Sequence, residues 1–520
     1  MTLRRTGVCR CFLHVKMEWG QIILLSIWLL LMVDVCRTAG MEPSLKIMSR
    51  RKVLVISLDG FGHHYLDKYP WRYLATNLYS AGSYPRKFRN QFVTKTFPNH
   101  FSVATGLYEE VHGVIGNNIY DSSLNKTFGM DDKELFMQNP LVSPVWTLNE
   151  EHGGHSGCIM WPGCGVAYRG KNVTFLSPFH QHALFNESID KSIEWFTNER
   201  TPANLIFLYH EEPDHVGHIY GPNSSQVEEE LRKIDEGIGY LYQMLTVHKL
   251  RDTVDVIVMS DHGMSAVKEE NVIFLDDIVD SSLYHISGTS PLLNVWTTFE
   301  KQLEVYSSLL EGSRTHNYTV YLKEDPQFLA WHYSKNTRIS QISILAAEGY
   351  VFKDFKNYID YMKKKGATDL TDTHGNHGYP VDIPNMEPIF VAAGPSFKRG
   401  FKAPDFSNID TYMLLCHLLN LAPGPNNGTA DNISSILVEP ISSTLIRPLS
   451  VTLGCLVALL GLIGILACAL TKKEKHRPVS AESLINGYVH RKTMRGQRRE
   501  PLQDVSEEEC LLDANIIDEV

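Results

Sequence analysis

The sequence lacks a long run of basic residues, an internal repeat and a low-complexity linker, and it is poor in cysteine. A formal net charge of −10, without any basic run, gives no reason to expect nucleic-acid binding. Only three cysteines lie in residues 41–448, the outer domain predicted below, so a disulfide scaffold is excluded and the fold must depend on a hydrophobic core. Cys158 and Cys164 could close a short disulfide, whereas Cys416 lies in an apolar helical stretch and is expected to be a buried thiol.

Charged residues are also absent from two apolar segments, one toward each end of the chain. The first, residues 22–33, is too short to cross a bilayer, follows basic residues and precedes small ones, which predicts a signal peptide over residues 1–40. An uncleaved N-terminal anchor is the alternative, and Met17 could be the true start. The second, residues 449–470, is long enough at roughly 1.5 Å per residue for a hydrocarbon core of about 30 Å, and it predicts a transmembrane helix.

Basic residues follow the second segment, so the positive-inside rule places residues 471–520 in the cytosol as a polar, disordered tail. We expect a single-pass type I protein of the plasma membrane, with its catalytic domain, residues 41–448, outside the cell. The tail contains Glu507 with Leu511 and Leu512, a spacing typical of acidic dileucine signals that bind a sorting adaptor and direct endosomal or lysosomal cycling. The N-glycosylation sequons all lie in the predicted outer domain: Asn125, Asn172, Asn186, Asn223, Asn317, Asn427 and Asn432.

Short apolar runs alternate with amphipathic stretches through the outer domain. The runs are interpreted as buried strands, each ending in polar residues or glycine, and they cover residues 52–60, 203–212, 253–263 and 387–395. The stretch 225–250 repeats apolar residues at spacings of three and four, which predicts a helix. Continuous apolar strands that alternate with amphipathic helices favour an α/β fold, with a doubly wound, mostly parallel sheet covered by helices on both faces.

Carboxylates and imidazoles follow the predicted strands. Three aspartates come after three different strands, one with an adjacent histidine and one with a histidine four residues on, and a further histidine lies in a glycine-rich loop before the last strand. Ligands of such sheets bind at the carboxyl ends of the strands, and Asp and His are suitable zinc ligands. Taken singly, each residue has a plainer interpretation as a cap or a core residue, but together they predict a two-metal site suited to in-line displacement at phosphorus. The residues are Asp59, Asp214, His218, Asp261, His262 and His377.

A candidate nucleophile lies in the run FVTKTFPNHFSVATG, residues 92–106. Pro98 is expected to keep Phe97 out of helical geometry and to open a helix. A hydroxyl just ahead of a helix lies beside free N–H groups and the positive end of the helix dipole, so Thr96 is placed to attack an anionic phosphorus. The alternative is that Thr96 only caps the helix.

Six motifs occur in order between residues 52 and 380: SLDGF, TKTFPNHFSVATGLYEEVHGVIGNNIYD, MWPG, LYHEEPDHVGHIYGP, SDHGM and NHGY. In these motifs the sequence resembles the ectonucleotide pyrophosphatase/phosphodiesterase family of the alkaline phosphatase superfamily. One catalytic domain followed by a C-terminal span is most similar to family members 4 and 5, because the additional modules of members 1 to 3 are not visible. The resemblance implies an alkaline-phosphatase-like fold and a metal-dependent hydrolase.

The resemblance also implies the roles of the site residues. One zinc ion would be held by Asp59, Thr96, Asp261 and His262, and a second zinc ion by Asp214, His218 and His377. Thr96 would be the nucleophile and would form a covalent nucleotidyl-threonine. Water activated by the second zinc ion would then release a nucleoside monophosphate.

Five further positions are expected, by the same resemblance, to bind the substrate. Asn117 matches the family asparagine that donates to the phosphate, and Lys95 could add positive charge. Phe97 and Tyr209 match aromatic positions that sandwich the base, and Phe185 stands where a tyrosine is common. Core packing is the alternative for these aromatic residues. The implied substrates are small nucleotides, such as dinucleoside polyphosphates, NAD or nucleoside triphosphates.

Some positions depart from the family pattern and leave the substrate open. Pro380 and Val381 follow NHGY in place of an acidic-amide pair, and Cys164 follows MWPG where an aspartate is frequent. His374 is a second candidate for the ligand from the glycine-rich loop. A choline-phospholipid phosphodiesterase is the alternative enzyme, and a receptor-like ectodomain with weak or no activity is the alternative outside enzymes.

Overall fold

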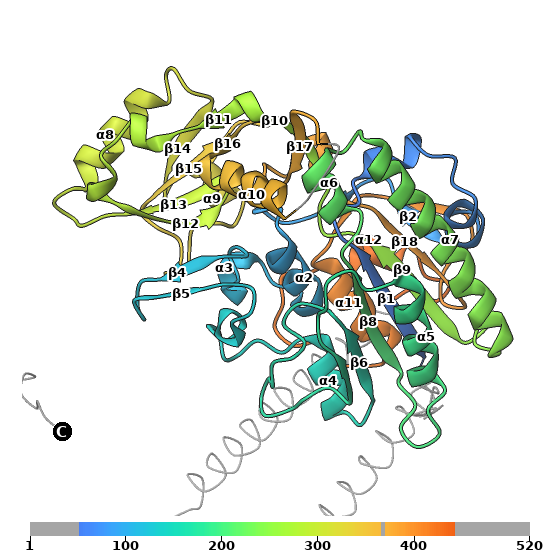
Figure 1. Ribbon diagram of the computed structural model, residues 1–520. Helices are drawn as coiled ribbons and strands as arrows, with labels where there is room; N and C mark the ends of the chain where they lie inside the picture. Colours follow the sequence, from blue (N-terminus) through green and yellow to red (C-terminus); the bar gives the residue numbers. More distant parts are fainter. Residues whose placement is uncertain (1–50, 366–369, 442–520) are drawn as a thin grey trace, which may run out of the picture. The chain divides into compact units, whose positions relative to one another are not determined.

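The computed structural model describes residues 51–365 and 370–441 (Figure 1). The predicted signal peptide, transmembrane helix and cytoplasmic tail with its sorting motif therefore lie outside the described residues. Within the described ranges, no helix is both long and apolar enough to cross a membrane.

An eight-stranded sheet forms the centre of the fold. Its strands, in spatial order, are β19 (Phe401–Ala403), β2 (Ser83–Pro85), β18 (Phe390–Ala393), β9 (Val254–Met259), β1 (Lys52–Leu58), β8 (Leu205–His210), β6 (Ser156–Ile159) and β7 (Phe175–Ser177). The strands β9, β1 and β8 are almost continuously buried, as expected of strands covered on both faces. β1 pairs in parallel with both of its neighbours, with Val53 opposite Leu205 in β8 and opposite Asp255 in β9.

The sheet is mixed, because β18 runs antiparallel to both β9 and β2. The other neighbouring strands pair in parallel. A buried apolar run has the same pattern in either direction, so the sequence predicts the strand but not its reversal. Phe390 at the start of β18 lies opposite Met259 at the end of β9. The loop before β18 therefore reaches the edge of the sheet where β1, β8 and β9 end.

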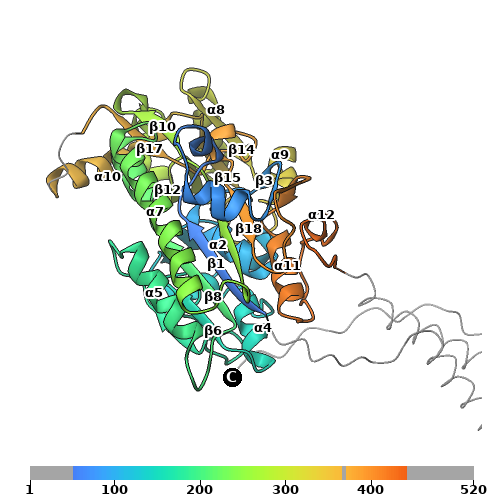
Figure 2. The ribbon, with the colours of Figure 1, turned by 90° about the vertical axis from the view of Figure 1, so that its right-hand side faces the viewer.

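Helices cover both faces of the sheet (Figures 1 and 2). α5 (Phe185–Phe196) and α7 (Ser225–Val247) lie on one face, and α2 (Thr96–Thr105), α4 (Val145–Glu151) and α11 (Asp410–Leu418) lie on the other. α7 follows the predicted pattern, because its apolar residues at spacings of three and four, such as Leu231 and Ile238, are buried. Its start is fixed by the side chain of Ser224, which accepts a hydrogen bond from the N–H of Val227.

An insertion between β9 and β18 builds a second, smaller sheet that the sequence patterns do not predict. It is antiparallel, in the order β12 (His285–Thr289), β13 (Leu292–Trp296), β15 (Ile342–Ala346) and β14 (Tyr318–Leu322). The helices of the insertion are α8 (Gln302–Gly312), α9 (Pro326–Ala330) and α10 (Lys353–Lys364). Two short ladders complete it, β10 (Ser265–Lys268) with β17 (Thr373–Asn376) and β11 (Val272–Ile273) with β16 (Val351–Phe352). The insertion has its own apolar core.

Short elements complete the described fold: α3 (Glu109–His112), α6 (Asp214–Tyr220), α12 (Asp431–Ser434), β3 (Phe88–Arg89) paired with β20 (Phe406–Ser407), and β4 (Ile119–Asp121) paired with β5 (Lys126–Phe128). Cys158 and Cys164 form the disulfide that the sequence left as an option, and Cys416 is a buried free thiol, as predicted. The sequon asparagines from Asn125 to Asn427 have exposed side chains.

Candidate active site

The predicted metal ligands meet at one edge of the central sheet. Asp59 follows β1, Asp214 opens α6 after β8, and Asp261 follows β9. These strands are parallel neighbours, so their carboxyl ends lie side by side. His377 joins them from the loop before β18, because that strand is antiparallel and begins where the others end. The topology thus gathers side chains that are more than three hundred residues apart in the sequence.

Two groups of three residues have ligand atoms that all lie within 4.8 Å of one another. The first group consists of Asp214, His218 and His377. In it, His218 Nε2 lies 3.3 Å from Asp214 Oδ2 and 3.1 Å from His377 Nε2. The second group consists of Asp59, Asp214 and His262. His262 Nε2 lies 3.3 Å from Asp59 Oδ1. Asp261 adjoins the second group, with its Oδ2 atom 3.1 Å from His262 Nε2.

The three histidines of these groups are held in one tautomer. Each Nδ1 atom lies 2.8 to 2.9 Å from a backbone carbonyl oxygen, which can only accept, so Nδ1 must carry the proton. Each Nε2 atom therefore keeps its lone pair and faces the cluster, the arrangement typical of metal-binding histidines. The pairs are His218 with Gly375, His262 with Gly263 and His377 with Thr94.

The three carboxylates each present a buried oxygen that has no hydrogen-bond partner: Asp59 Oδ1, Asp214 Oδ1 and Asp261 Oδ2. The other oxygen of Asp261 accepts from the N–H groups of Gly60 and His262, which aims the free oxygen at the cluster. Burial raises the pKa of Asp59 well above its usual value, and the carboxylates of Asp261 and Asp214 add to this. Buried carboxylate oxygens without partners are costly unless a cation binds them. The donor set therefore fits divalent cations.

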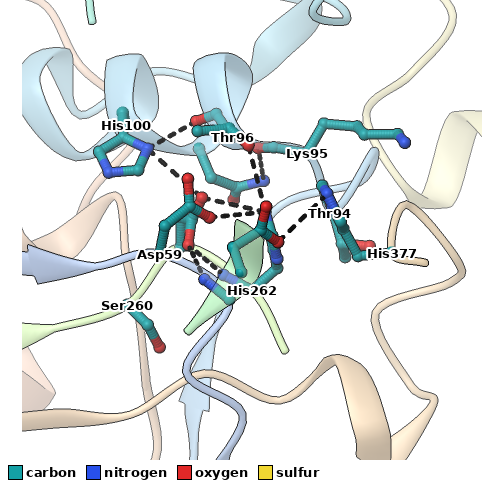
Figure 3. Close-up of polar contacts among 12 residues, drawn as sticks. Asp59, Thr94, Lys95, Thr96, His100, Ser260, His262 and His377 are labelled. Atoms are coloured by element: carbon teal, nitrogen blue, oxygen red, sulfur yellow. Dashed lines mark hydrogen bonds and ion pairs between the residues drawn. The ribbon is translucent and has the colours of Figure 1, made fainter. Parts of the chain in front are cut away.

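The hydroxyl of Thr96 lies beside this cluster, at the first residue of α2 (Figure 3). Its Oγ1 atom is 3.4 Å from His262 Nε2, and the residue is 7% exposed. The expectation that Phe97 lies outside the helix is wrong, because α2 already includes Phe97 and Pro98. Proline is tolerated in the first helical turn, where the N–H groups have no partner within the helix. Thr96 is thus placed at the positive end of the helix dipole.

Two contacts that the sequence patterns do not reveal hold Thr96, the candidate nucleophile, and Asp59, a candidate metal ligand, in place. His100 Nδ1 donates to the carbonyl of Thr96 at 2.7 Å, and His100 Nε2 lies 2.8 Å from Ser57 Oγ. Tyr209 donates its hydroxyl hydrogen to Asp59 Oδ2 at 2.5 Å. The spacing of four residues between Thr96 and His100 inside TFPNH is the signal that could have indicated the first contact.

A cavity of about 800 Å³ opens beside Thr96 and the metal-binding cluster. Lys95, Phe97, Asn117 and Tyr209 line it, as the resemblance implies. Asn117 Oδ1 accepts from the N–H of Phe97 at 2.9 Å, so the amide NH₂ of Asn117 is the group left for the cavity. The structure therefore brings four of the five expected substrate-binding residues to one cavity.

Phe185 is the exception and is not among the residues that line this cavity. It begins α5, stacks on the ring of His210 with centroids 4.9 Å apart, and is buried against α7. An aromatic residue on the inner face of an amphipathic helix packs into the core, so the position of Phe185 agrees with the alternative of core packing. Phe179, in the loop before α5, lines the cavity instead and is 57% exposed.

Lys95 lies at the cavity wall, but its ammonium group is directed away from Thr96 (Figure 3). Lys95 Nζ donates to the carbonyl of Ser290 at 2.6 Å, and burial lowers the pKa of Lys95 to about 8. Of the two candidate loop histidines, His374 uses both ring nitrogens elsewhere, with Ile219 O at 2.7 Å and Glu269 Oε1 at 3.1 Å. His377 is therefore the loop histidine that faces the cluster.

A cluster of residues suited to divalent cations lies at the carboxyl-terminal ends of the strands of an α/β sheet, beside a buried hydroxyl and a cavity. This combination of fold and site defines a metal-dependent hydrolase. The family model for "Type I phosphodiesterase / nucleotide pyrophosphatase" matches residues 53–380. The chain belongs to this family, in agreement with the resemblance of its motifs.

Individual relatives support the same assignment. The human ectonucleotide pyrophosphatase/phosphodiesterase family member 5 is 36% identical over 417 residues, which cover 80% of this chain and 83% of the relative. Human bis(5'-adenosyl)-triphosphatase ENPP4 is 34% identical over 433 residues, which cover 82% of this chain and 91% of the relative. A solved structure of an inactive variant of murine family member 5, in complex with AMP, superposes with a TM-score of 0.67 at 36% identity. That match covers 74% of this chain and 100% of the murine chain.

Proposed function

We propose that this chain is an extracellular two-zinc enzyme that cleaves nucleotide phosphodiester or phosphoanhydride bonds through Thr96. The observation that carries the proposal is the convergence of six carboxylate and imidazole ligands around one buried hydroxyl at a helix start. Dinucleoside polyphosphates, NAD and nucleoside triphosphates are the proposed substrates. The first of these classes also appears in the name of the relative ENPP4, a bis(5'-adenosyl)-triphosphatase.

Two zinc ions would be held by the two halves of the cluster. The first half is Asp59, Thr96, Asp261 and His262, and the second is Asp214, His218 and His377. Support comes from the unpartnered buried carboxylate oxygens and from the unprotonated Nε2 atoms of the histidines. When bound, zinc supplies Lewis-acid stabilisation of the phosphoryl charge and lowers the pKa of a neighbouring hydroxyl or water.

Thr96 carries the covalent step. Its Oγ atom forms a bond to phosphorus while the bond from phosphorus to the leaving oxygen breaks, and the leaving group takes the electron pair. The hydroxyl proton of Thr96 passes to solvent in this first step. Water then attacks the same phosphorus, the bond from phosphorus to Thr96 Oγ breaks, Oγ takes a proton back, and a nucleoside monophosphate is released. His100 and Ser57 hold the Thr96 peptide in place, and the amide of Asn117 donates to a phosphate oxygen.

Aromatic rings on the cavity wall would bind the base of the transferred nucleotide. Phe97, Phe179 and Tyr209 line the cavity, and the ring centroids of Phe179 and Tyr209 lie 6.4 Å apart. Base–aromatic stacking is tolerant of base identity, which suits a broad nucleotide substrate range. A choline headgroup could use the same rings through cation–π contacts. Turnover of a nitrophenyl ester of a nucleotide, compared with nitrophenyl-phosphocholine, separates the two substrate classes.

We also propose that the catalytic domain faces the outside of the cell and is glycosylated. The Cys158–Cys164 disulfide is typical of an oxidising compartment. The exposed sequon asparagines from Asn125 to Asn427 are accessible to a glycosyltransferase. Cleavage by a glycosidase, followed by a mass shift of the protein, tests the glycosylation.

The nucleophile is tested by replacing Thr96. Thr96→Ala should abolish turnover but keep the bound zinc and the thermal stability, whereas Thr96→Ser should keep part of the activity. Thr105→Ala is the matched control, because Thr105 is a buried threonine at the other end of the same helix. A chelator should silence the wild-type enzyme and added zinc should restore it. Substantial turnover by Thr96→Ala, with zinc in place, would rule out Thr96 as the nucleophile.

A further inference from the structure

The cavity continues past the metal-binding cluster along α10, a region that the proposed mechanism does not use. Asp354, Phe355 and Tyr358 of this helix line the cavity. Tyr358 is half-buried, and its ring centroid lies 6.1 Å from that of His218. An aromatic side chain therefore stands directly beside the ligand group of Asp214, His218 and His377.

A chain of hydrogen bonds holds α10 against the loop of the nucleophile. Asp354 Oδ2 accepts from the N–H of Ser290 at 2.8 Å, and Asp354 Oδ1 accepts from Ser290 Oγ at 2.6 Å. The carbonyl of Ser290 in turn accepts from Lys95 Nζ at 2.6 Å. Because Lys95 is buried and precedes Thr96, the position of Tyr358 is fixed relative to the nucleophile.

The direction of displacement points the leaving group toward this helix. In phosphoryl transfer the attacking and leaving oxygens lie roughly in line, on opposite sides of phosphorus. Thr96 Oγ1 lies at the His262 side of the cluster, 3.4 Å from His262 Nε2. The leaving oxygen is then at the other side, where His218 and His377 lie, and the group that it carries extends past His218 to Tyr358.

We propose that α10 forms a leaving-group subsite in which Tyr358 stacks on the base of a second nucleotide. This inference rests on the proposed function. Among the proposed substrates it favours dinucleoside polyphosphates, because their leaving group carries a nucleoside. Inorganic pyrophosphate, the leaving group of a nucleoside triphosphate, has no ring and gains nothing from Tyr358.

Two substrates with the same transferred group isolate this subsite. In diadenosine triphosphate and in ATP, Thr96 Oγ forms the bond to the α-phosphorus of the transferred AMP. The bond to the bridging oxygen breaks, and ADP or pyrophosphate leaves with the electron pair. The ratio of the two kcat/KM values, measured on one sample of the full-length zinc-loaded protein, reports the leaving group alone. That ratio does not depend on the fraction of folded enzyme.

Tyr358→Ala should lower this ratio, diadenosine triphosphate over ATP, by about tenfold, the loss expected for one base–aromatic stack. Tyr358→Phe keeps the ring and should stay close to the wild-type ratio. Tyr361→Ala is the matched control, because Tyr361 lies on the same helix, is 54% exposed and is not among the residues that line the cavity.

The outcomes separate this inference from the proposed function. If the ratio is unchanged in Tyr358→Ala, or falls equally in Tyr361→Ala, the proposed leaving-group subsite is wrong. The proposed nucleotide phosphodiesterase activity is not affected by that result. If the wild-type protein turns over neither substrate, both proposals fail. A fall confined to Tyr358→Ala supports the subsite.

Discussion

Replacing Tyr209 by phenylalanine removes one hydroxyl and keeps the ring, so it separates two roles of this residue. The motif resemblance implies that the ring contacts the base. In the structure the hydroxyl also donates to Asp59 Oδ2 at 2.5 Å, inside the core of the site. The other oxygen of Asp59 has no hydrogen-bond partner and lies 3.3 Å from His262 Nε2. Tyr209 therefore orients a ligand as well as lining the cavity.

The expected loss follows from the kind of hydrogen bond that is removed. A hydrogen bond to a charged group contributes about 1.5–3 kcal/mol. At about 1.4 kcal/mol per factor of ten, this corresponds to roughly 10- to 100-fold in affinity. The range agrees with the roughly 10- to 100-fold loss of metal affinity on mutation of groups that orient metal ligands. Tyr209→Phe should therefore weaken zinc binding to this extent, while KM for the nucleotide changes little.

A competition titration between the protein and a chelator of known zinc affinity measures the effect directly, and activity is recorded in the same samples. Tyr240→Phe is the matched control, because Tyr240 donates to Asp190 Oδ1 at 2.6 Å in an exposed pair, and neither residue lines the cavity. The control should bind zinc like the wild type. If Tyr209→Phe binds zinc within about twofold of the wild type but raises KM, the hydroxyl serves the substrate and the orienting role is refuted.

Two further predictions concern buried charges. Arg338 is 2% exposed and pairs with Asp121 at 2.9 Å, so Arg338→Met leaves a buried carboxylate unpaired and should lower the free energy of unfolding by about 3–5 kcal/mol. Arg86→Met, at an exposed pair, should have little effect in the same denaturant titration, and equal losses would contradict the reasoning. Burial raises the pKa of Glu109 well above its usual 4.5, so the folded protein binds this proton more tightly than the unfolded chain does. Stability should then fall as the pH rises above 4.5, and Glu109→Gln should reduce that fall; an identical pH dependence in both proteins would exclude this source.

The sequence predicts the positions of residues that directly follow buried strands, because the direction and the end of a strand determine at which edge of the sheet the next residues lie. Asp59, Asp214 and Asp261 each follow an apolar run, and parallel neighbours bring such positions to one edge. His377 comes from a loop before a strand, and its place at the same edge depends on the reversal of β18. No local pattern encodes that reversal, and the family motif, not the spacing, favours His377 over His374.

The cavity wall was harder to predict, because side-chain direction and the long insertion decide it. Phe185 and Phe179 lie six residues apart, yet one packs into a helix interface and the other faces the cavity. Lys95 precedes Thr96, but its ammonium group donates to the carbonyl of Ser290, a residue of the insertion. The strands of the insertion are short and pair across long sequence separations, so periodicity alone does not indicate them.

The loop that carries Thr96, the proposed nucleophile, also fixes one histidine of the candidate metal-binding cluster. His377 Nδ1 donates to the carbonyl of Thr94 at 2.9 Å. The hydroxyl of Thr94 accepts from the N–H of Gly378 at 3.0 Å and donates to the carbonyl of Tyr379 at 2.8 Å. These buried bonds join the two loops, so neither can shift without leaving polar groups of the other unpaired. Thr96, two residues from Thr94, therefore keeps its position relative to His377. The motifs TKTFPN and NHGY supply each other's hydrogen-bond partners, which is a physical reason for their occurrence together in one chain.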